Sequence, residues 1–138
     1  MNLFPETTGF YEVNHTADVA IAVTGECIES LFIQSLKGLE HIICVQRHEV
    51  IKRQSKMAIY ANSYESLLVA FLNETLVLLE KETWLVCDQL KIGKGQLELT
   101  YDLFRCSKYG SEVKAVTYNM MDIIEHQGMY STMIVFDV

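Results

Sequence analysis

Two carboxylates follow one another at the end of the sequence, in the stretch MIVFDV (133–138). In an extended strand, Asp137 would share a face with Met133 and Val135, and a carboxylate beside buried side chains is costly unless it is paired. The α-carboxylate of Val138 adds a second negative charge one residue away. A hard divalent cation bound through oxygen ligands would relieve the repulsion between them. The alternative is that Asp137 and Val138 extend into water and bind nothing.

Two further charged residues have positions that suit functional groups. Asp18 immediately precedes an apolar strand, a place where an aspartate also commonly caps backbone amides. Lys114 lies in EVKAVTY (112–118), on a predicted strand where a single lysine is ordinarily a solvated edge charge. If this strand neighbours the final one, Lys114 is placed to balance the two carboxylates or to bind a phosphate.

The common motifs of enzymes and zinc sites are absent from the sequence. GKG (93–95) lacks the spacing of a phosphate-binding loop and is better explained as a hairpin turn. His41, Cys44 and His48 have helical spacing, but Cys44 and His48 lie on either side of the predicted helix end. Core and surface roles are therefore favoured over a zinc site. No nucleophile elbow and no nucleophile–base pair stand out.

The composition is that of a folded domain with an acidic surface. The 138 residues are half apolar and 21% charged, which predicts one domain over residues 1–138. The net charge of −7 argues against stable direct binding to nucleic acid, and it favours cations, a basic partner protein or plain solubility. No signal sequence and no apolar stretch of about 18 residues is present, so we expect a cytoplasmic protein without a membrane segment. The four scattered cysteines are expected to be reduced and mostly buried.

Hydrophobic patterns predict the elements that would position the charged residues. Two amphipathic helices are expected at 26–44 and about 63–81, because their apolar residues recur at three- and four-residue steps. Asn62 is the predicted N-cap of the second helix, with Glu65 as its capping-box partner. Strands are predicted in these segments: two within 10–25, then 49–61, 84–92, 96–105, 111–126 and 129–138.

These elements predict an α+β fold. The two amphipathic helices are expected to pack on a mainly antiparallel or mixed β-sheet, which buries their apolar faces. Turns are expected at 93–95 and near Gln127-Gly128. The first and last strands are expected to lie near each other.

Four segments together resemble the archease family. They are HTADVAI (15–21), ESLLVAFLNETLVLLE (65–80), EVKAVTYN (112–119) and IVFDV (134–138). None is decisive alone, but they occur in the family's order and at similar spacing, and they span nearly the whole chain. The resemblance implies an archease-like α+β fold.

The resemblance also implies a function. Archeases are protein cofactors of the RtcB-type GTP-dependent RNA ligase, which joins RNA ends in tRNA splicing and RNA repair. They promote guanylylation of the ligase's active-site histidine and multiple turnover, and they do not join RNA themselves. The chain is therefore expected to be an activator of this ligase and not an enzyme.

A metal site is implied by the same resemblance. The family's metal ligands correspond to Asp18, Asp137 and the terminal Val138, and its usual metal is calcium, although magnesium and manganese accept similar oxygen ligands. Such a site requires Asp18 and Asp137 to lie within about 5 Å of each other. A functional lysine of the family corresponds to Lys114, which is expected to contact the partner or a phosphate.

The sequence departs from the family's pattern at several positions. Asn119 stands where many members have histidine, and Val77 stands where tyrosine is frequent. The stretch FRCSKYGSE (104–112) lacks a proline- and histidine-containing loop of many relatives. If that loop touches the ligase, the partner contacts of this chain differ.

Two other functions stay open from the residues alone. One is a stand-alone metal-dependent enzyme that acts on a small phosphate-bearing substrate through the same carboxylates and Lys114. It would turn over substrate without a partner. The other is a chaperone-like or structural binding module, whose partner binding would follow the apolar surface and survive loss of the carboxylates.

Overall fold

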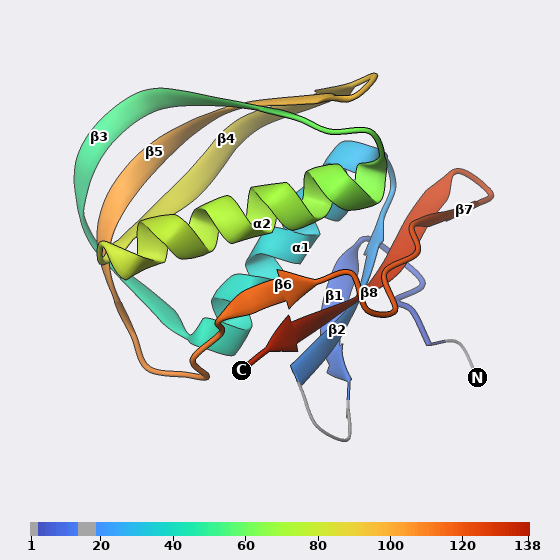
Figure 1. Ribbon diagram of the computed structural model, residues 1–138, viewed down its shortest axis with the longest axis horizontal. Coiled ribbons are helices and arrows are strands. Elements are labelled where there is room, and N and C mark those ends of the chain that lie inside the picture. Colours follow the sequence, from blue (N-terminus) through green and yellow to red (C-terminus); the bar gives the residue numbers. More distant parts are fainter. Residues whose placement is uncertain (1–2, 14–18) are drawn as a thin grey trace.

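The computed structural model describes residues 3–13 and 19–138, and in these ranges it contains two helices and eight strands (Figure 1). The helices are α1 (Ile28–Ile43) and α2 (Tyr64–Glu80). The strands are β1 (Gly9–Val13), β2 (Val19–Gly25), β3 (Val45–Tyr60), β4 (Thr83–Gly93), β5 (Gln96–Lys108), β6 (Ala115–Thr117), β7 (Ile124–His126) and β8 (Met129–Asp137). Neither helix is both long and apolar enough to cross a membrane, as judged on the described ranges.

β8 is the central strand of a five-stranded antiparallel sheet. β2 pairs with β8, with Val19 opposite Phe136, and β1 extends the sheet beyond β2. β6 and β7 pair with opposite ends of β8. Ile134, Val135 and Phe136 are at most 1% exposed, as expected for a strand that is covered on both faces. The first and last strands were predicted to lie near each other. Both β1 and β8 belong to this sheet, with β2 between them.

A second antiparallel sheet has three strands in the order β3-β5-β4. Its register shifts between Arg47 and Ser55 in β3, and between Cys87 and Gln89 in β4. Bulges of this kind bend a strand and increase its twist. The sheet accordingly curves around the helices, as Figure 1 shows.

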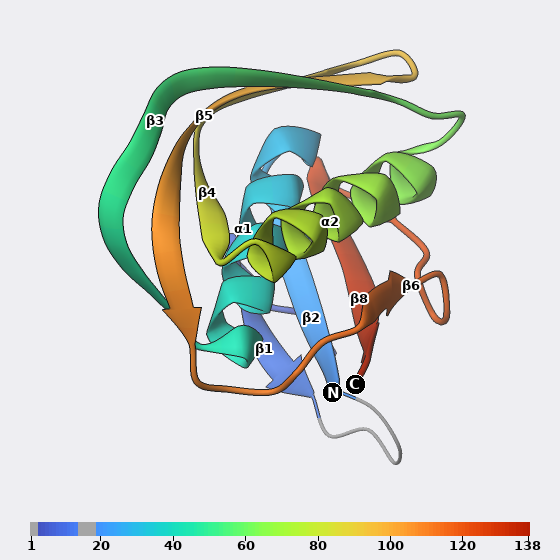
Figure 2. The ribbon, with the colours of Figure 1, turned by 60° about the vertical axis from the view of Figure 1, so that its left-hand side comes forward.

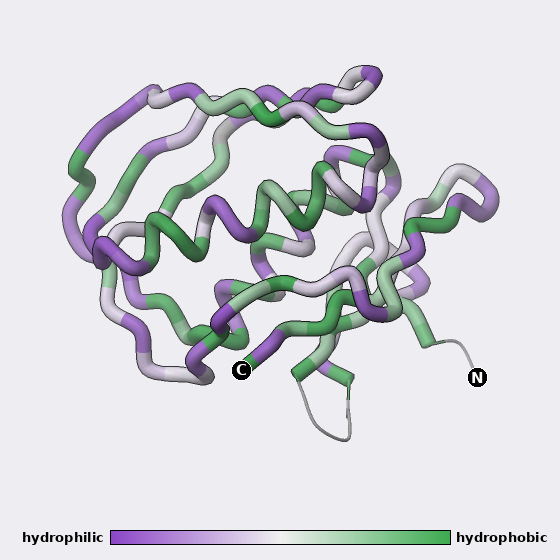
Figure 3. The backbone as a smooth tube through the Cα atoms, in the orientation of Figure 1, coloured by the Kyte–Doolittle hydropathy of each residue, from purple (hydrophilic) through white to green (hydrophobic). Residues whose placement is uncertain are grey.

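Both helices lie between the two sheets (Figure 2). α1 packs mainly on β1 and β2, whereas α2 contacts β3, β4, β5 and β6. Hydrophobic stretches run along both helices and along β8 (Figure 3). The largest buried side chains of this core are Trp84, Phe32, Phe71 and Phe136, and burial of such apolar surface is the main stabilising contribution to the fold.

The predicted α+β fold is confirmed, and both predicted turns are present. Gly93 pairs with Gln96 across the β4–β5 turn, and Gly95 takes a positive φ of 71° there. In the β7–β8 turn, Gln127 and Gly128 have φ values of 52° and 81°. Two successive residues with positive φ suit a tight hairpin, because this geometry matches the twist of the flanking strands.

The predicted cap of α2 is wrong by one residue. Ser63, not Asn62, is the N-cap, and its hydroxyl accepts a hydrogen bond from the backbone N–H of Ser66 at 3.0 Å. Glu65 makes no capping box. Its carboxylate instead accepts a hydrogen bond from the backbone N–H of Ile123 at 2.9 Å, so a tertiary contact uses the side chain that was expected to cap the helix.

Two other predictions need correction. The single strand expected at 111–126 is two short strands, β6 and β7, and the strand expected to begin at residue 49 begins at Val45. The cysteines are free, but Cys27 and Cys44 are exposed, so the expectation of mostly buried thiols fails for both. These two cysteines occupy the ends of α1, where Cys27 is the N-cap and Cys44 the C-cap.

Candidate functional site

The exposed end of β8 carries two of the predicted site residues. Asp137 ends the strand and Val138 follows it, and both are exposed although the three residues before them are buried. The burial cost expected for the Asp137 carboxylate therefore does not apply, because that side chain is in water. The buried part of β8 fixes the direction of the strand, and the two residues project from it at the surface.

Lys114 lies beside this end of β8. Its backbone N–H donates a hydrogen bond of 2.7 Å to the backbone carbonyl of Asp137, and the next residue, Ala115, is paired with Asp137 in the β6–β8 ladder. The strand on which Lys114 was predicted is thus a neighbour of the last strand. The three ion pairs found among the described residues involve neither Lys114 nor Asp137, and the lysine side chain is exposed.

The third predicted metal ligand, Asp18, lies outside the described residues. The first described residue after it, Val19, is paired with Phe136, which immediately precedes Asp137. Within the described ranges, no three His, Cys, Asp or Glu side chains are grouped closely enough to hold a metal ion. The oxygen donors of Asp137 and Val138 are nevertheless of the type that hard divalent cations prefer, so their chemistry fits such an ion.

Helix α2 holds the strand beside Lys114 in place through Asn73. The Oδ1 atom of Asn73 accepts a hydrogen bond from the Val116 N–H at 3.0 Å, and its Nδ2 atom donates to the Val116 carbonyl at 3.5 Å. Val116 is paired with Phe136 on β8. At the opposite, free edge of β6, the Asn73 side chain provides the hydrogen bonds that a neighbouring strand would otherwise provide. Sequence reasoning missed this role. The sequence feature that could have indicated it is an amide residue, Asn73, within the apolar pattern of the helix.

The segment before Lys114 is tied to the end of α1. The backbone N–H groups of Tyr109, Gly110 and Ser111 donate to the carbonyls of Cys44, Ile43 and Ile42, at 2.8–3.2 Å. Carbonyls at the end of a helix have no partner within the helix, and these contacts satisfy three of them. A Cβ atom on Gly110 would lie 2.4 Å from the Ile42 carbonyl oxygen, so the close approach requires glycine.

Asn119 and Val77, which depart from the family's pattern, both lie on the surface. Asn119 is exposed, and its N–H donates to the Thr117 hydroxyl at 3.2 Å. Val77, on α2, is 45% exposed.

The two histidines considered for a zinc site make other contacts. His48 Nε2 hydrogen bonds with the Ser107 hydroxyl at 2.8 Å, and the His41 ring lies 5.8 Å from that of Phe10.

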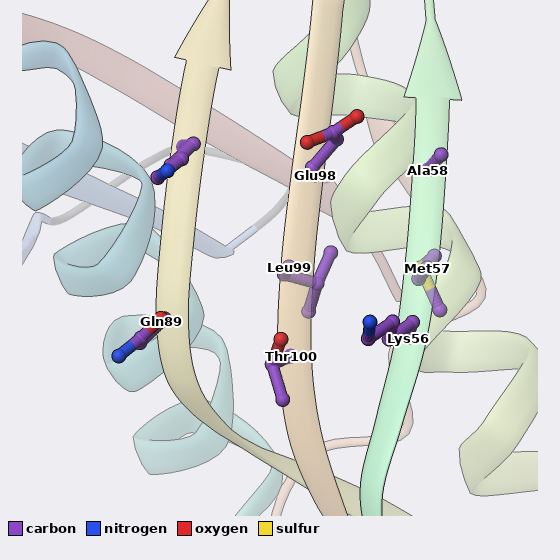
Figure 4. Close-up of a pocket in the computed structure, with 8 residues that line it drawn as sticks. Lys56, Met57, Ala58, Gln89, Glu98, Leu99 and Thr100 are labelled. Atoms are coloured by element: carbon purple, nitrogen blue, oxygen red, sulfur yellow. The ribbon is translucent and has the colours of Figure 1, made fainter.

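Two hollows on the surface are lined by none of the predicted site residues that fall within 3–13 and 19–138. One, of about 480 Å³, lies on the β3-β5-β4 sheet (Figure 4). The other, of about 320 Å³, lies between the N-terminal segment and the β7–β8 hairpin, next to a hydrogen bond of 2.9 Å between the hydroxyls of Thr24 and Ser131. The end of β8 is therefore an exposed site that lies outside both hollows.

Comparison with known proteins gives consistent matches. The model of the Archease protein family matches residues 10–138. The chain is 30% identical to "Protein archease-like" of Drosophila melanogaster, over 99% of this chain and 94% of that protein. It is 25% identical to "Protein archease" of Methanosarcina mazei, over 91% of this chain and 93% of that protein.

Solved structures show the same fold. The crystal structure of an archease from Thermotoga maritima, described as a "possible chaperone", matches with a TM-score of 0.70 and 21% identity, over 91% of this chain and 94% of that one. The solution structure of a Methanobacterium thermoautotrophicum protein matches with a TM-score of 0.70 and 22% identity, over 94% and 99% of the two chains.

Proposed function

Because the chain belongs to the archease family, we propose that it is a protein cofactor of an RtcB-type GTP-dependent RNA ligase. It would promote guanylylation of the ligase's active-site histidine and multiple turnover in tRNA splicing and RNA repair. The observation that carries the proposal is the extent of the family match, which runs over residues 10–138 and so includes β6 and β8. The protein would act in the cytoplasm and would not be an enzyme itself.

The end of β8 is the part of the molecule that we propose to enter the ligase's active site. Asp137 and Val138 project from a buried strand, so they can reach into a partner's cleft without any change in the fold. Lys114 is held beside them by the backbone hydrogen bond to Asp137. Transfer of a nucleotidyl group depends mainly on positioning and charge neutralisation, and a rigid tip with charges of both signs suits both tasks.

A divalent cation, most simply calcium with magnesium or manganese as alternatives, is part of this proposal. Asp137 and Val138 would hold it together with Asp18, all through carboxylate oxygens. Its chemistry there would be to supply positive charge beside the phosphates of the nucleotide. Lys114 would bind a phosphate oxygen or balance the carboxylates, and either role keeps the tip from repelling an anionic substrate.

The test is a guanylylation assay with an RtcB-type ligase from the same source. The ligase is mixed with GTP, a divalent metal and increasing amounts of this protein, and the covalent ligase–GMP adduct is followed in time. We expect the rate to rise with the protein and the increase to disappear for Asp137→Ala. Glu80→Ala, which removes an exposed carboxylate from α2, is the matched control and should stimulate as the wild type does.

Further arms of the assay separate the partner from the site. Adding a few residues after Val138 converts its α-carboxylate into a neutral peptide, and we expect this to remove the stimulation. Stimulation that survives both this extension and Asp137→Ala would keep the ligase as the partner and reject the site. If no stimulation occurs and this protein alone hydrolyses a phosphoester, it is a metal-dependent enzyme and the cofactor proposal is wrong.

A further inference from the structure

The basic residues are concentrated in one layer of the molecule. The segments that form the three-stranded sheet, 45–60 and 83–108, contain eight of the eleven lysine and arginine residues but only four of the eighteen acidic residues. The basic residues are Arg47, Lys52, Arg53, Lys56, Lys91, Lys94, Arg105 and Lys108, and the acidic ones are Glu49, Asp88, Glu98 and Asp102. This layer is therefore net positive in a chain whose net charge is −7.

The outer face of this sheet is polar and is turned away from the helices. Met57, Leu99 and Leu90 are paired across the three strands and pack into the core between the sheets. Side chains alternate between the faces of a sheet, so the neighbouring residues point outward. The outward pairs are Lys56 with Thr100, Thr100 with Gln89, Ala58 with Glu98, and Glu98 with Lys91.

These outward residues line the hollow of about 480 Å³ (Figure 4). Ala58 leaves space on the outer face because its side chain is a single methyl group. Lys56 and Lys91 are exposed and stand on the two edge strands, on either side of β5. Neither lysine takes part in an ion pair found in the described ranges, whereas Arg53 and Arg105 are paired with the carboxylates of Asp102 and Glu49. The two lysines are thus available to an anion.

An exposed aromatic ring adjoins the hollow. Tyr60 follows Ala58 on the same face of β3, and its residue is 72% exposed. Its hydroxyl accepts a hydrogen bond of 3.4 Å from the Gln96 side chain, which also donates to the Glu98 carboxylate at 2.7 Å. Among the side chains that the structure describes, Glu98 is the one acid lining the hollow, and this hydrogen bond holds its side chain toward Gln96.

We propose that this outer face, between Lys56, Lys91 and Tyr60, binds single-stranded RNA. Lysines neutralise phosphates, and an exposed tyrosine on a sheet can stack with an unpaired base. Thr100 lies on β5, between the strands that carry the two lysines, and Gln89 lies on β4 with Lys91. The hydroxyl of Thr100 and the amide of Gln89 both line the hollow and can hydrogen bond with a ribose 2′-hydroxyl, which a deoxyribose lacks. A shallow face with one exposed ring suits a single strand, whose bases are accessible, better than a duplex.

The outer face lies away from the proposed contact with the ligase. The outer face is separated from β8 by the helices, so a ligase bound at the end of β8 would leave it free (Figure 2). The expectation that the protein does not bind nucleic acid stably came from its net charge, which averages an acidic part and a basic part. Two lysines predict weak, salt-dependent binding, and this is compatible with a role in holding RNA near a larger partner.

The test measures binding of a fluorescent twelve-nucleotide oligo(U) to this protein alone, by anisotropy at low salt. We expect binding that weakens as salt increases, with a slope of log K against log [salt] of about −1.4, for two phosphates contacted by a single strand. The double variant Lys56→Gln/Lys91→Gln should lose at least about tenfold in affinity. The control Lys37→Gln/Lys81→Gln lowers the net charge by the same amount, at two exposed lysines outside this face. It should bind oligo(U) as the wild type does.

Two single variants test the other features of the face. Tyr60→Ala should weaken binding about tenfold, while Tyr60→Phe keeps the ring and should restore it. Glu98→Gln removes the carboxylate from the hollow and should strengthen binding severalfold, whereas the same change at the exposed Glu74 should have no effect. Circular dichroism confirms that each variant is folded, which is expected because all of these side chains are on the surface.

Several outcomes would overturn the proposal. Absence of oligo(U) binding at low salt, or an equal loss with the Lys37/Lys81 control, would show that the face binds no RNA. Equal affinity for the matching oligo(dU) would reject RNA as the specific ligand. Equal affinity for polyglutamate would assign the face to acidic protein segments instead. The assay contains no ligase, so its failure leaves the guanylylation result unaffected.

Discussion

At the scale of single residues, Cys106 links burial to the pH dependence of stability. Burial on β5 raises the pKa of its thiol above the ordinary value of 9.0, and the negative charge of Glu82 raises it further. The folded chain therefore keeps this thiol protonated at a pH where the unfolded chain ionises it. The associated stability is fully present below the unfolded-state pKa, and it is lost as the pH rises through the folded-state pKa.

We expect the free energy of unfolding to fall as the pH is raised from about 8 to about 10, and to fall less steeply in Cys106→Ala. Urea titrations at several pH values measure this slope. Cys27→Ser is the control, because Cys27 is exposed and serine also caps a helix well. The slope of this control should match that of the wild type. Parallel slopes for Cys106→Ala and wild type would contradict the prediction.

The residues of the candidate site differ in how far the sequence could identify them. Asp137 and Lys114 stand out because charges interrupt apolar strands, and the structure brings them together through the β6–β8 ladder. The sequence could not show that Asp137 is exposed. An alternating pattern predicts which face of the sheet a side chain lies on, but it does not predict where the sheet ends. Asn73 escaped notice because its partner is a backbone amide, and backbone amides have no signature in a sequence.

At the scale of the elements, the start of α2 shows the limit of capping rules. Asn62 and Ser63 are both favoured N-cap residues, and Glu65 suggested a capping box with Asn62. The structure uses Glu65 to bind the Ile123 N–H, and Ser63 caps the helix through Ser66. The sequence favours Asn62 and Ser63 almost equally as N-caps. The contact of Glu65 with a residue 58 positions away in the chain is incompatible with the capping box, so Ser63 is the cap.

Substitution at the two positions separates these solutions. Ser63→Ala should lower the free energy of unfolding by about 1 kcal/mol, because the Ser66 N–H loses its acceptor. Asn62→Ala should change it by less than about 0.5 kcal/mol, since surface substitutions without a specific contact have small effects. Chemical denaturation measures both. A larger loss for Asn62→Ala than for Ser63→Ala would mean that Asn62 caps the helix in solution.

The stretch between β6 and β7 is where the strand prediction failed. The residues from 111 to 126 alternate well enough to suggest one strand, but Met120 has a positive φ of 61° and the Met121 N–H donates to the Tyr118 carbonyl in a turn. A methionine rarely adopts that conformation, so its sequence carries no turn signal. The chain leaves β8 after Thr117 and returns to it at Ile124.

The contact between α2 and β6 gives a prediction that links stability to the site. Asn73→Ala leaves the N–H and carbonyl of Val116 without their side-chain partner, and should cost about 1–3 kcal/mol. Asn73→Asp keeps an acceptor for the N–H and should cost less. Hydrogen exchange at the Val116 amide should quicken in both variants, and most in Asn73→Ala. Because Lys114 stands on the same segment, stimulation of the ligase should fall too.

The neighbouring residue supplies the control for this experiment. Glu74 is exposed on α2, and Glu74→Ala should leave both the Val116 exchange rate and ligase stimulation unchanged. An unchanged exchange rate in Asn73→Ala would mean that pairing with β8 alone holds β6, and that Asn73 has no positioning role.

At the scale of the whole molecule, the sequence predicted the elements but not their layering. Periodicity showed two helices with apolar faces, and one sheet is enough to cover such faces. In α2, however, Leu67, Leu68 and Val69 are consecutive and all buried, because the helix is enclosed between two sheets. Net charge had the same limitation, since a single sum for the chain conceals that one sheet is basic.

If the end of β8 is the contact with the ligase, as proposed, its loss should separate function from stability, because the two residues that form it are exposed. Removing Asp137 and Val138 takes away two exposed residues, the backbone hydrogen bond from Lys114 to Asp137, and the pairing of Ala115 with Asp137 at the end of the β6–β8 ladder. The loss should be about 1–2 kcal/mol. A chain that ends at Phe136 should therefore fold, with a thermal transition a few degrees lower, and should fail to stimulate the ligase. Thermal melts followed by circular dichroism, together with the guanylylation assay, measure the two effects.

A chain that ends at Met133 is the matched comparison, and it should not fold. It lacks Ile134, Val135 and Phe136, whose burial contributes about 1.5–3 kcal/mol each, and their combined loss approaches the whole stability of a small domain. It also removes every pairing partner of β6 on β8, and the partners of Val19, Ala20 and Ile21 on β2. If the chain ending at Phe136 also unfolds, the tip is part of the structural core, and loss of stimulation on truncation would not identify a functional site. If that chain folds and still stimulates, the proposed contact with the ligase lies elsewhere.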